Sequence, residues 1–106
     1  MIPKNLEECF DVLNKELKPD DLAFIKASDD NATKLHHSLG RYLRNTWGLW
    51  GEDSSLKQYF GNLGINHADD MSSIILHSFH RHLNNKPLDI DAQVKKYQDY
   101  WKKIRD

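Results

Sequence analysis

The chain has 106 residues, enough for one domain with a single modest core and too few for two. Its 15 lysines and arginines nearly balance its 16 aspartates and glutamates, which gives a formal net charge of −1 with histidine neutral. This balance argues against general nucleic-acid binding, which requires a basic excess. Cys9 is the only cysteine, so an intramolecular disulfide is excluded.

The amino terminus and the apolar runs indicate where the protein acts. Acidic residues appear early, at Glu7 and Glu8, and no apolar segment of the kind found in a signal peptide precedes them. No apolar run approaches the roughly 20 residues that a membrane-spanning helix needs. We therefore expect a cytoplasmic protein with no membrane-embedded part.

The first third of the chain predicts two helices. Asn5 followed by Glu8 is a capping-box pattern, and apolar residues at helical spacing follow it, so we predict a helix over about residues 5–17. Pro19 and the two acids after it suit the first turn of a second, short helix, which we expect to end near residues 27–28.

A central helix is predicted over roughly residues 31–47. Gly40 would lie in its middle, where glycine costs about 1 kcal/mol relative to alanine. A glycine retained there indicates that another backbone or a ligand comes close. Gly48 is placed to end this helix as a left-handed residue, with Leu49 folding back onto it.

The second half of the chain predicts three more helices. A short helix follows the polar loop 52–55, another begins near Asn66 or His67 and ends at residues 84–87, and the last runs over about 91–106. No segment shows the alternation of a strand. We predict an all-α fold, a single domain over residues 1–106 built as a bundle of five or six helices.

One candidate ligand-binding cluster lies on the central helix and its exit. Arginine forks bind phosphate or carboxylate, and tryptophan faces stack on bases or cations. The alternative is that the arginines pair with Asp69, Asp70 or Glu52 and that the tryptophans belong to the core. The candidate residues of this cluster are His37, or its neighbour His36, with Arg41, Arg44, Asn45, Trp47 and Trp50.

A second candidate cluster lies at the start of the next long helix and comprises His67, Asp69, Asp70 and Ser73, with Ser72 beside them. Free N–H groups at a helix start can bind an anion, but the two acids oppose one. They suit the helix dipole or a clamp on the arginines better. If both helices share one core, Arg41 or Arg44 should lie within ion-pair reach of Asp69 or Asp70.

Catalytic and metal-binding patterns are weak in this sequence. His77 and His80 lie three residues apart and could share a metal, but no nearby residues complete a set of four ligands. We find no nucleophile elbow, phosphate-binding loop or zinc-protease motif. The sequence therefore predicts no catalytic residue, no metal and no cofactor, and a protein that is not an enzyme.

Two motifs resemble a family of short bacterial proteins that carry a domain of unknown function. One is His-x-x-Leu-Gly-Arg-x-x-Arg-Asn-x-Trp-Gly-Leu-Trp over residues 36–50, and the other is His-x-Asp-Asp-Met-Ser over residues 67–72. Ala68 stands where the family usually has proline, and either residue suits a first helical turn. The resemblance implies a small bacterial or phage protein and implies no activity.

We expect a non-catalytic protein that holds a small anionic, nucleotide-like ligand between the arginine/tryptophan helix and the helix start at His67. The alternative is a protein-interaction module, such as an immunity or antitoxin-like partner, or a homo-oligomer. The stripe of Tyr97, Trp101 and Ile104 on the 91–106 helix would then make the contact.

Overall fold

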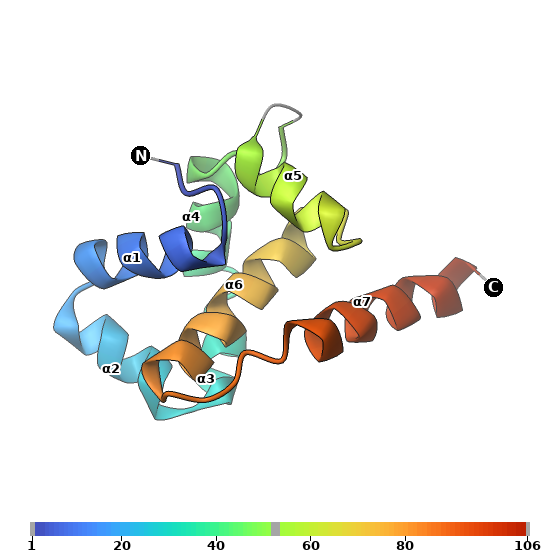
Figure 1. Cartoon of the computed structure of the whole chain (residues 1–106). Coiled ribbons are helices and arrows are strands. Elements are labelled where there is room, and N and C mark those ends of the chain that lie inside the picture. Colours follow the sequence, from blue (N-terminus) through green and yellow to red (C-terminus); the bar gives the residue numbers. More distant parts are fainter. Residues whose placement is uncertain (1, 52–53, 106) are drawn as a thin grey trace.

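The structure is a computed structural model that describes residues 2–51 and 54–105, and it contains seven helices over those residues. The fold is all-α, as the sequence predicts, with seven helices in place of five or six. They are α1 (Leu6–Glu16), α2 (Pro19–Ala27), α3 (Asp29–Lys34), α4 (Leu39–Thr46), α5 (Ser55–Asn62), α6 (Ala68–Leu83) and α7 (Ile90–Arg105) (Figure 1).

The prediction of one central helix over 31–47 is wrong, because the chain turns between α3 and α4. The Leu35 carbonyl accepts hydrogen bonds from the Ser38 N–H at 3.2 Å and from the Gly40 N–H at 2.8 Å, and this closes the turn. Gly40 consequently lies in the first turn of α4 and not in the middle of a long helix. This division largely accounts for the difference in helix number.

Helix α6 is the centre of the molecule. It packs against α1, α2, α3, α4 and α7, and Figure 1 shows it crossing the body between them. Both its apolar and its small polar residues are covered, as expected for a helix surrounded by others. Its buried residues are Ala68, Met71, Ser72, Ile74, Ile75, Leu76, Ser78, Phe79 and His80.

Helix ends follow the predicted chemistry closely. Asn5 Oδ1 accepts the Glu8 N–H at 2.9 Å and caps α1, and Pro19 occupies the first turn of α2. Gly48 has φ of +67°, and the Leu49 N–H donates to the Arg44 carbonyl at 3.0 Å. That pair of features is a Schellman ending, so the predicted left-handed role of Gly48 is confirmed.

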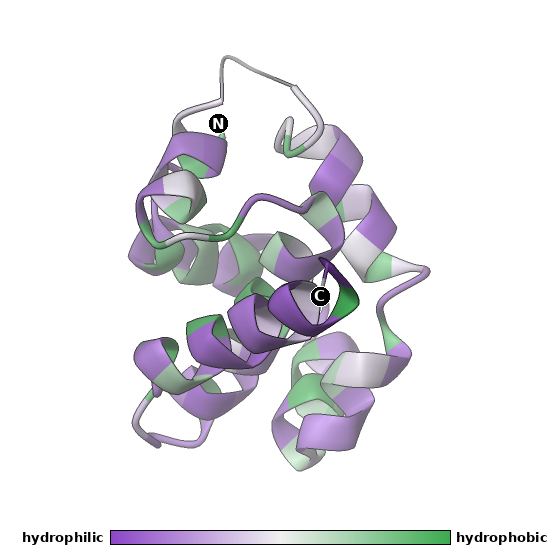
Figure 2. Ribbon diagram, turned by 90° about the vertical axis from the view of Figure 1, so that its right-hand side faces the viewer, coloured by the Kyte–Doolittle hydropathy of each residue, from purple (hydrophilic) through white to green (hydrophobic). Residues whose placement is uncertain are grey.

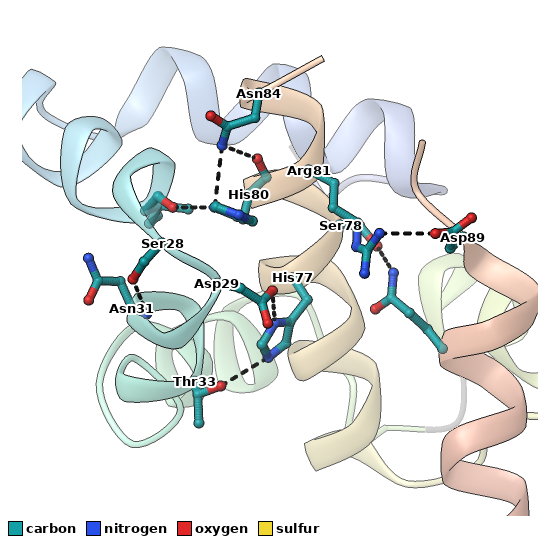
Figure 3. Close-up of polar contacts among 12 residues, drawn as sticks. Ser28, Asp29, Asn31, Thr33, His77, Ser78, His80, Arg81, Asn84 and Asp89 are labelled. Carbon is teal, nitrogen blue, oxygen red and sulfur yellow. Dashed lines mark hydrogen bonds and ion pairs between the residues drawn. The ribbon is translucent and has the colours of Figure 1, made fainter. Parts of the chain in front are cut away.

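Polar contacts tie α2 and α3 to α6 (Figure 3). His77 Nδ1 lies 2.7 Å from Asp29 Oδ1, and its Nε2 lies 3.3 Å from Thr33 Oγ1. The hydrogen bond with His77 lowers the pKa of Asp29. Buried His80 donates from Nδ1 to the Ile25 carbonyl at 2.7 Å. The two histidines weighed as metal ligands thus bind different helices.

Helix α7 is joined to the rest of the molecule by a limited contact with α6. It contributes Val94 to the core, and Gln93 Nε2 donates to Ser78 Oγ at 3.0 Å. The carboxyl-terminal half extends away from the other helices (Figure 1), and Figure 2, seen towards that end, shows a mostly hydrophilic ribbon with apolar bands. Within the described ranges, no helix combines the length and apolar character needed to cross a membrane.

Candidate functional site

Arg44 joins α4 to the first turns of α6 from a buried position, with 4% of the residue exposed. Its Nη1 donates to Ser72 Oγ at 2.8 Å and its Nη2 to the His36 carbonyl at 3.2 Å. Its Nε lies 3.3 Å from Asp69 Oδ1, but the N–H does not point at that oxygen, so the contact is an ion pair without an aligned hydrogen bond. The expected proximity of an arginine on this helix to Asp69 is confirmed.

Gly40 explains how the Arg44 side chain fits against the body. A methyl group at Gly40 would lie 3.1 Å from Arg44 Nη1 and 3.3 Å from the Leu35 carbonyl oxygen, both tighter than ordinary contacts. Ser72, whose hydroxyl donates to the Asp69 carbonyl at 3.0 Å, closes the other side. The close approach predicted at Gly40 is therefore made by a guanidinium group and by backbone.

The remaining candidates on α4 and its exit lie in different environments. His37, Arg41 and Asn45 are exposed, whereas Trp47 is buried in the core. Trp50 is 60% exposed, and its indole N–H donates to Asn45 Oδ1 at 3.0 Å.

A cation lies near the Trp50 ring, because the Arg44 guanidinium carbon is 6.0 Å from the ring centroid. Arg44 with its contacts to Ser72, the His36 carbonyl and Asp69, called the Arg44 clamp below, therefore lies close to Trp50. The other alternative partner, Glu52, lies outside the described residues.

At the start of α6, two side chains bind α7. The rings of His67 and Trp101 stack with centroids 3.8 Å apart, and the Trp101 indole donates to Asp70 Oδ2 at 2.8 Å. Ser73, the next candidate along α6, is half-buried. His67 and Asp70 thus hold α7 against α6, which the sequence alone did not indicate.

A groove of about 670 Å³ lies between Trp50, the start of α6 and α7. Volumes of this size are usual for binding sites, although this groove is partly open to solvent. Four of the residues proposed from the sequence line it, namely Trp50, His67, Asp69 and Asp70. The other lining residues are Ala68, Lys96, Tyr97, Asp99, Tyr100, Trp101 and Lys103.

Sequence reasoning missed most of the α7 wall of this groove. Tyr97 and Trp101 belong to the expected apolar stripe, but Tyr100 and the charged residues beside it were not among the proposed site residues. A usable signal was present, since Lys96, Tyr100 and Lys103 fall at i, i+4 and i+7 and thus on one helix face.

The charges around the groove are largely paired. Asp69 faces Arg44, and Asp99 Oδ2 accepts a hydrogen bond from Lys95 Nζ at 2.6 Å. Lys96 Nζ lies 5.5 Å from the centroid of the Tyr97 ring. Burial raises the pKa of Tyr97, so its hydroxyl is neutral at physiological pH. In the described part of the chain, no group of three or more histidine, cysteine or acidic residues is arranged to hold a metal ion.

Comparison with protein families now places the chain. The sequence profile of the domain of unknown function DUF6794 matches residues 2–83. The chain belongs to this family. Comparison with curated proteins and with solved structures gave no match. The matched segment ends with α6, so the body and the Arg44 clamp lie within the family domain while α7 follows it.

Proposed function

We propose that this DUF6794 protein is a non-catalytic interaction module whose groove between Trp50 and α7 receives an apolar segment of a protein partner. The observation that carries the proposal is the exposure of Trp50 and Tyr100, which line the groove and are 60% and 55% accessible. Trp and Tyr supply most of the strong anchor residues of protein interfaces. Exposed aromatic residues in a groove that charged residues also line, here Lys96, Asp99 and Lys103, are typical of an interaction site.

The polar residues of the groove support binding more than catalysis. Asp70 accepts the Trp101 indole N–H, Asp69 faces Arg44 and Asp99 binds Lys95. Groups already engaged in this way position the walls of a site. They are poorly placed to exchange protons with a substrate, which requires a group within hydrogen-bond reach of the reacting atoms.

The environment of Arg44 favours a protein partner over a small anion. A ligand-binding arginine needs donors directed at the ligand, but the two Nη atoms of Arg44 already donate to Ser72 and to the His36 carbonyl. Asp69 and Asp70 line the groove and would repel an anion.

A nucleotide-like anionic ligand is the second candidate, supported by one specific observation. The groove of about 670 Å³ combines stacking surfaces on Trp50 and Tyr100 with two lysines, Lys96 and Lys103. A base could stack on the aromatic rings while the lysines face its phosphates. The setting we propose for either function is the cytoplasm of a bacterium or of a phage-infected cell.

The test of the interaction module compares wild-type protein with groove variants as bait in a bacterial lysate. A partner identified by mass spectrometry is then purified, and its dissociation constant is measured by calorimetry. We expect Trp50→Ala and Tyr100→Ala each to weaken binding about tenfold or more. Phe24→Ala is the matched control, because Phe24 is an exposed aromatic on α2 that does not line the groove. Equal loss with Phe24→Ala, or none with the groove variants, would refute the proposal.

The second candidate is tested by thermal shift with nucleotides and cyclic nucleotides. A ligand present at 100 times its dissociation constant adds about 2.7 kcal/mol to the free energy of unfolding. Lys103→Ala should reduce that shift. Absence of any shift across the panel would remove this candidate and leave the interaction module in place.

A further inference from the structure

The exposed half of α7 is the strongest unexplained feature of the molecule. Tyr100 and Ile104 lie one turn apart on the same side of the helix, and both are more than half exposed. Figure 1 shows this half of the helix extending past the other helices. An exposed apolar pair beside a groove is a candidate contact surface for a partner.

The charges of α7 indicate which surface that is. Around Trp101, the helix carries an acid at Asp99 and a base at Lys103, placed symmetrically two residues to either side. Consider two copies of this helix packed antiparallel, with the two Trp101 residues at the same level along the helix axes. Each Asp99 then lies level with the partner's Lys103, so the pair forms two ion pairs. A parallel pairing would instead set Asp99 against the partner's Asp99. The Asp99/Lys103 pair is therefore complementary to itself in the antiparallel orientation. Asp99 would then share its carboxylate between the partner's Lys103 and Lys95 of its own helix, to which it is bonded at 2.6 Å.

We propose that the occupant of the groove is a second copy of this chain, with the two α7 helices packed antiparallel about a two-fold axis. Tyr100 and Ile104 of each copy then enter the groove beside Trp50 of the other. Isologous contacts of this kind are the commonest arrangement in homo-oligomers, because one self-complementary patch is used twice. The inference rests on the proposed function and names the partner as the protein itself.

The experiment measures the mass of the full chain by sedimentation equilibrium over a range of concentrations. Wild-type protein forms a concentration-dependent dimer. Asp99→Lys and Lys103→Asp each place like charges opposite one another twice, and each raises the dimer dissociation constant about tenfold or more. Tyr100→Ala does the same by removing an apolar anchor, and Phe24→Ala, on α2, leaves the constant unchanged. Circular dichroism of each variant checks that the helices are intact.

The decisive measurement mixes the two charge variants. Lysine at position 99 of one variant faces aspartate at position 103 of the other, and the remaining pair is also of opposite charge. The mixture therefore dimerises more tightly than either variant alone. The double variant Asp99→Lys/Lys103→Asp likewise regains the homodimer. A monomer at every concentration, or a mixture that stays monomeric, overturns the proposal. If such a monomer still binds a different protein through Trp50, only the identity of the partner is refuted and the interaction module stands.

Discussion

Arg44 is the residue whose removal should affect stability most strongly among the charged groups. Arg44→Ala deletes two hydrogen bonds and the ion pair with Asp69. Because Asp69 remains 60% exposed, its stranded carboxylate is still solvated, and we expect a loss of about 2–3 kcal/mol, below the full cost of an isolated buried charge. Urea unfolding measures the change.

Arg41→Ala is the matched control for that prediction. Arg41 lies on the same helix but is exposed, so its replacement should change the free energy of unfolding by no more than about 0.5 kcal/mol. Equal effects of the two substitutions would contradict the assignment of Arg44 as the clamp between α4 and α6.

Gly40 gives a second prediction, in which a glycine-to-alanine change lowers the free energy of unfolding although helix propensity alone would raise it. Alanine in a helix is normally favoured over glycine by about 1 kcal/mol. Here the added methyl group would crowd Arg44 Nη1 and the Leu35 carbonyl, and Nη1 cannot retreat without losing Ser72. We expect Gly40→Ala to destabilise the protein by about 1 kcal/mol.

Gly61→Ala provides the comparison, because a methyl group there would meet nothing within 4 Å. It lies in α5, and we expect it to stabilise the protein by up to about 1 kcal/mol. Thermal unfolding of the two variants should therefore shift in opposite directions. A gain in stability at Gly40 would show that the clamp tolerates displacement.

At the scale of the elements, the stacking of Trp101 on His67 stabilises the packing of α7 against α6. Trp101→Ala removes the stack and the hydrogen bond to Asp70, while Val94 and Gln93 remain in place. We expect the amide hydrogens in the second half of α7 to exchange about tenfold faster or more, with α6 unaffected. Mass spectrometry of exchange resolves the two helices. Equal acceleration in both would mean that α7 is an integral part of the core.

The elements also show where sequence reasoning succeeded and where it failed. Three helix ends were predicted correctly because they depend on local effects. Asn5 caps a helix with its side chain, Pro19 has a fixed φ, and Gly48 adopts a positive φ. The turn between α3 and α4 was not predicted, because Leu35, Leu39 and Leu43 keep helical spacing across it. In the turn the Gly40 N–H bonds to the Leu35 carbonyl, and the His36 carbonyl accepts from Arg44 Nη2 in place of a backbone N–H, a side-chain contact that hydrophobic spacing does not report.

The candidate site was predictable in part for the same reason. Pairing of an arginine with Asp69 followed from charge and from the need for a shared core. The groove could not be predicted in this way, because its α7 wall depends on how α7 packs against His67 and Asp70. The angle at which two helices pack is not encoded in the hydrophobic spacing of the sequence. Trp47 and Trp50 show the limit well, since the two lie three residues apart and only one of them is exposed.

For the molecule as a whole, stability should depend on pH through His36. Burial, and then the charge of Arg44, lower the pKa of His36 below its ordinary value of 6.5. The unfolded chain therefore takes up a proton at a higher pH than the folded protein, and the free energy of unfolding falls as pH drops from about 6.5 through the lowered pKa. Denaturant midpoints between pH 7.5 and pH 5 should decrease, and His36→Asn should flatten that slope. An unchanged slope in the variant would assign the dependence to other groups.

Asp29 extends the same dependence to acid pH. Its pKa is lowered by the hydrogen bond with His77, so the stabilisation it provides is present above its ordinary value of 3.8 and is lost as pH falls through the lowered value. Both groups thus act in the same direction, and they act on contacts that hold α3 and the turn after it against α6.

The central place of α6 has a consequence for how the protein is made. Five helices are synthesised before α6 begins at Ala68, and four of its five packing partners, α1 to α4, are among them. Until the ribosome has released Leu83, the apolar faces of those helices lack the surface that covers them. The nascent chain is therefore expected to stay open and to engage chaperones for most of its synthesis, and to collapse within a short interval once α6 emerges.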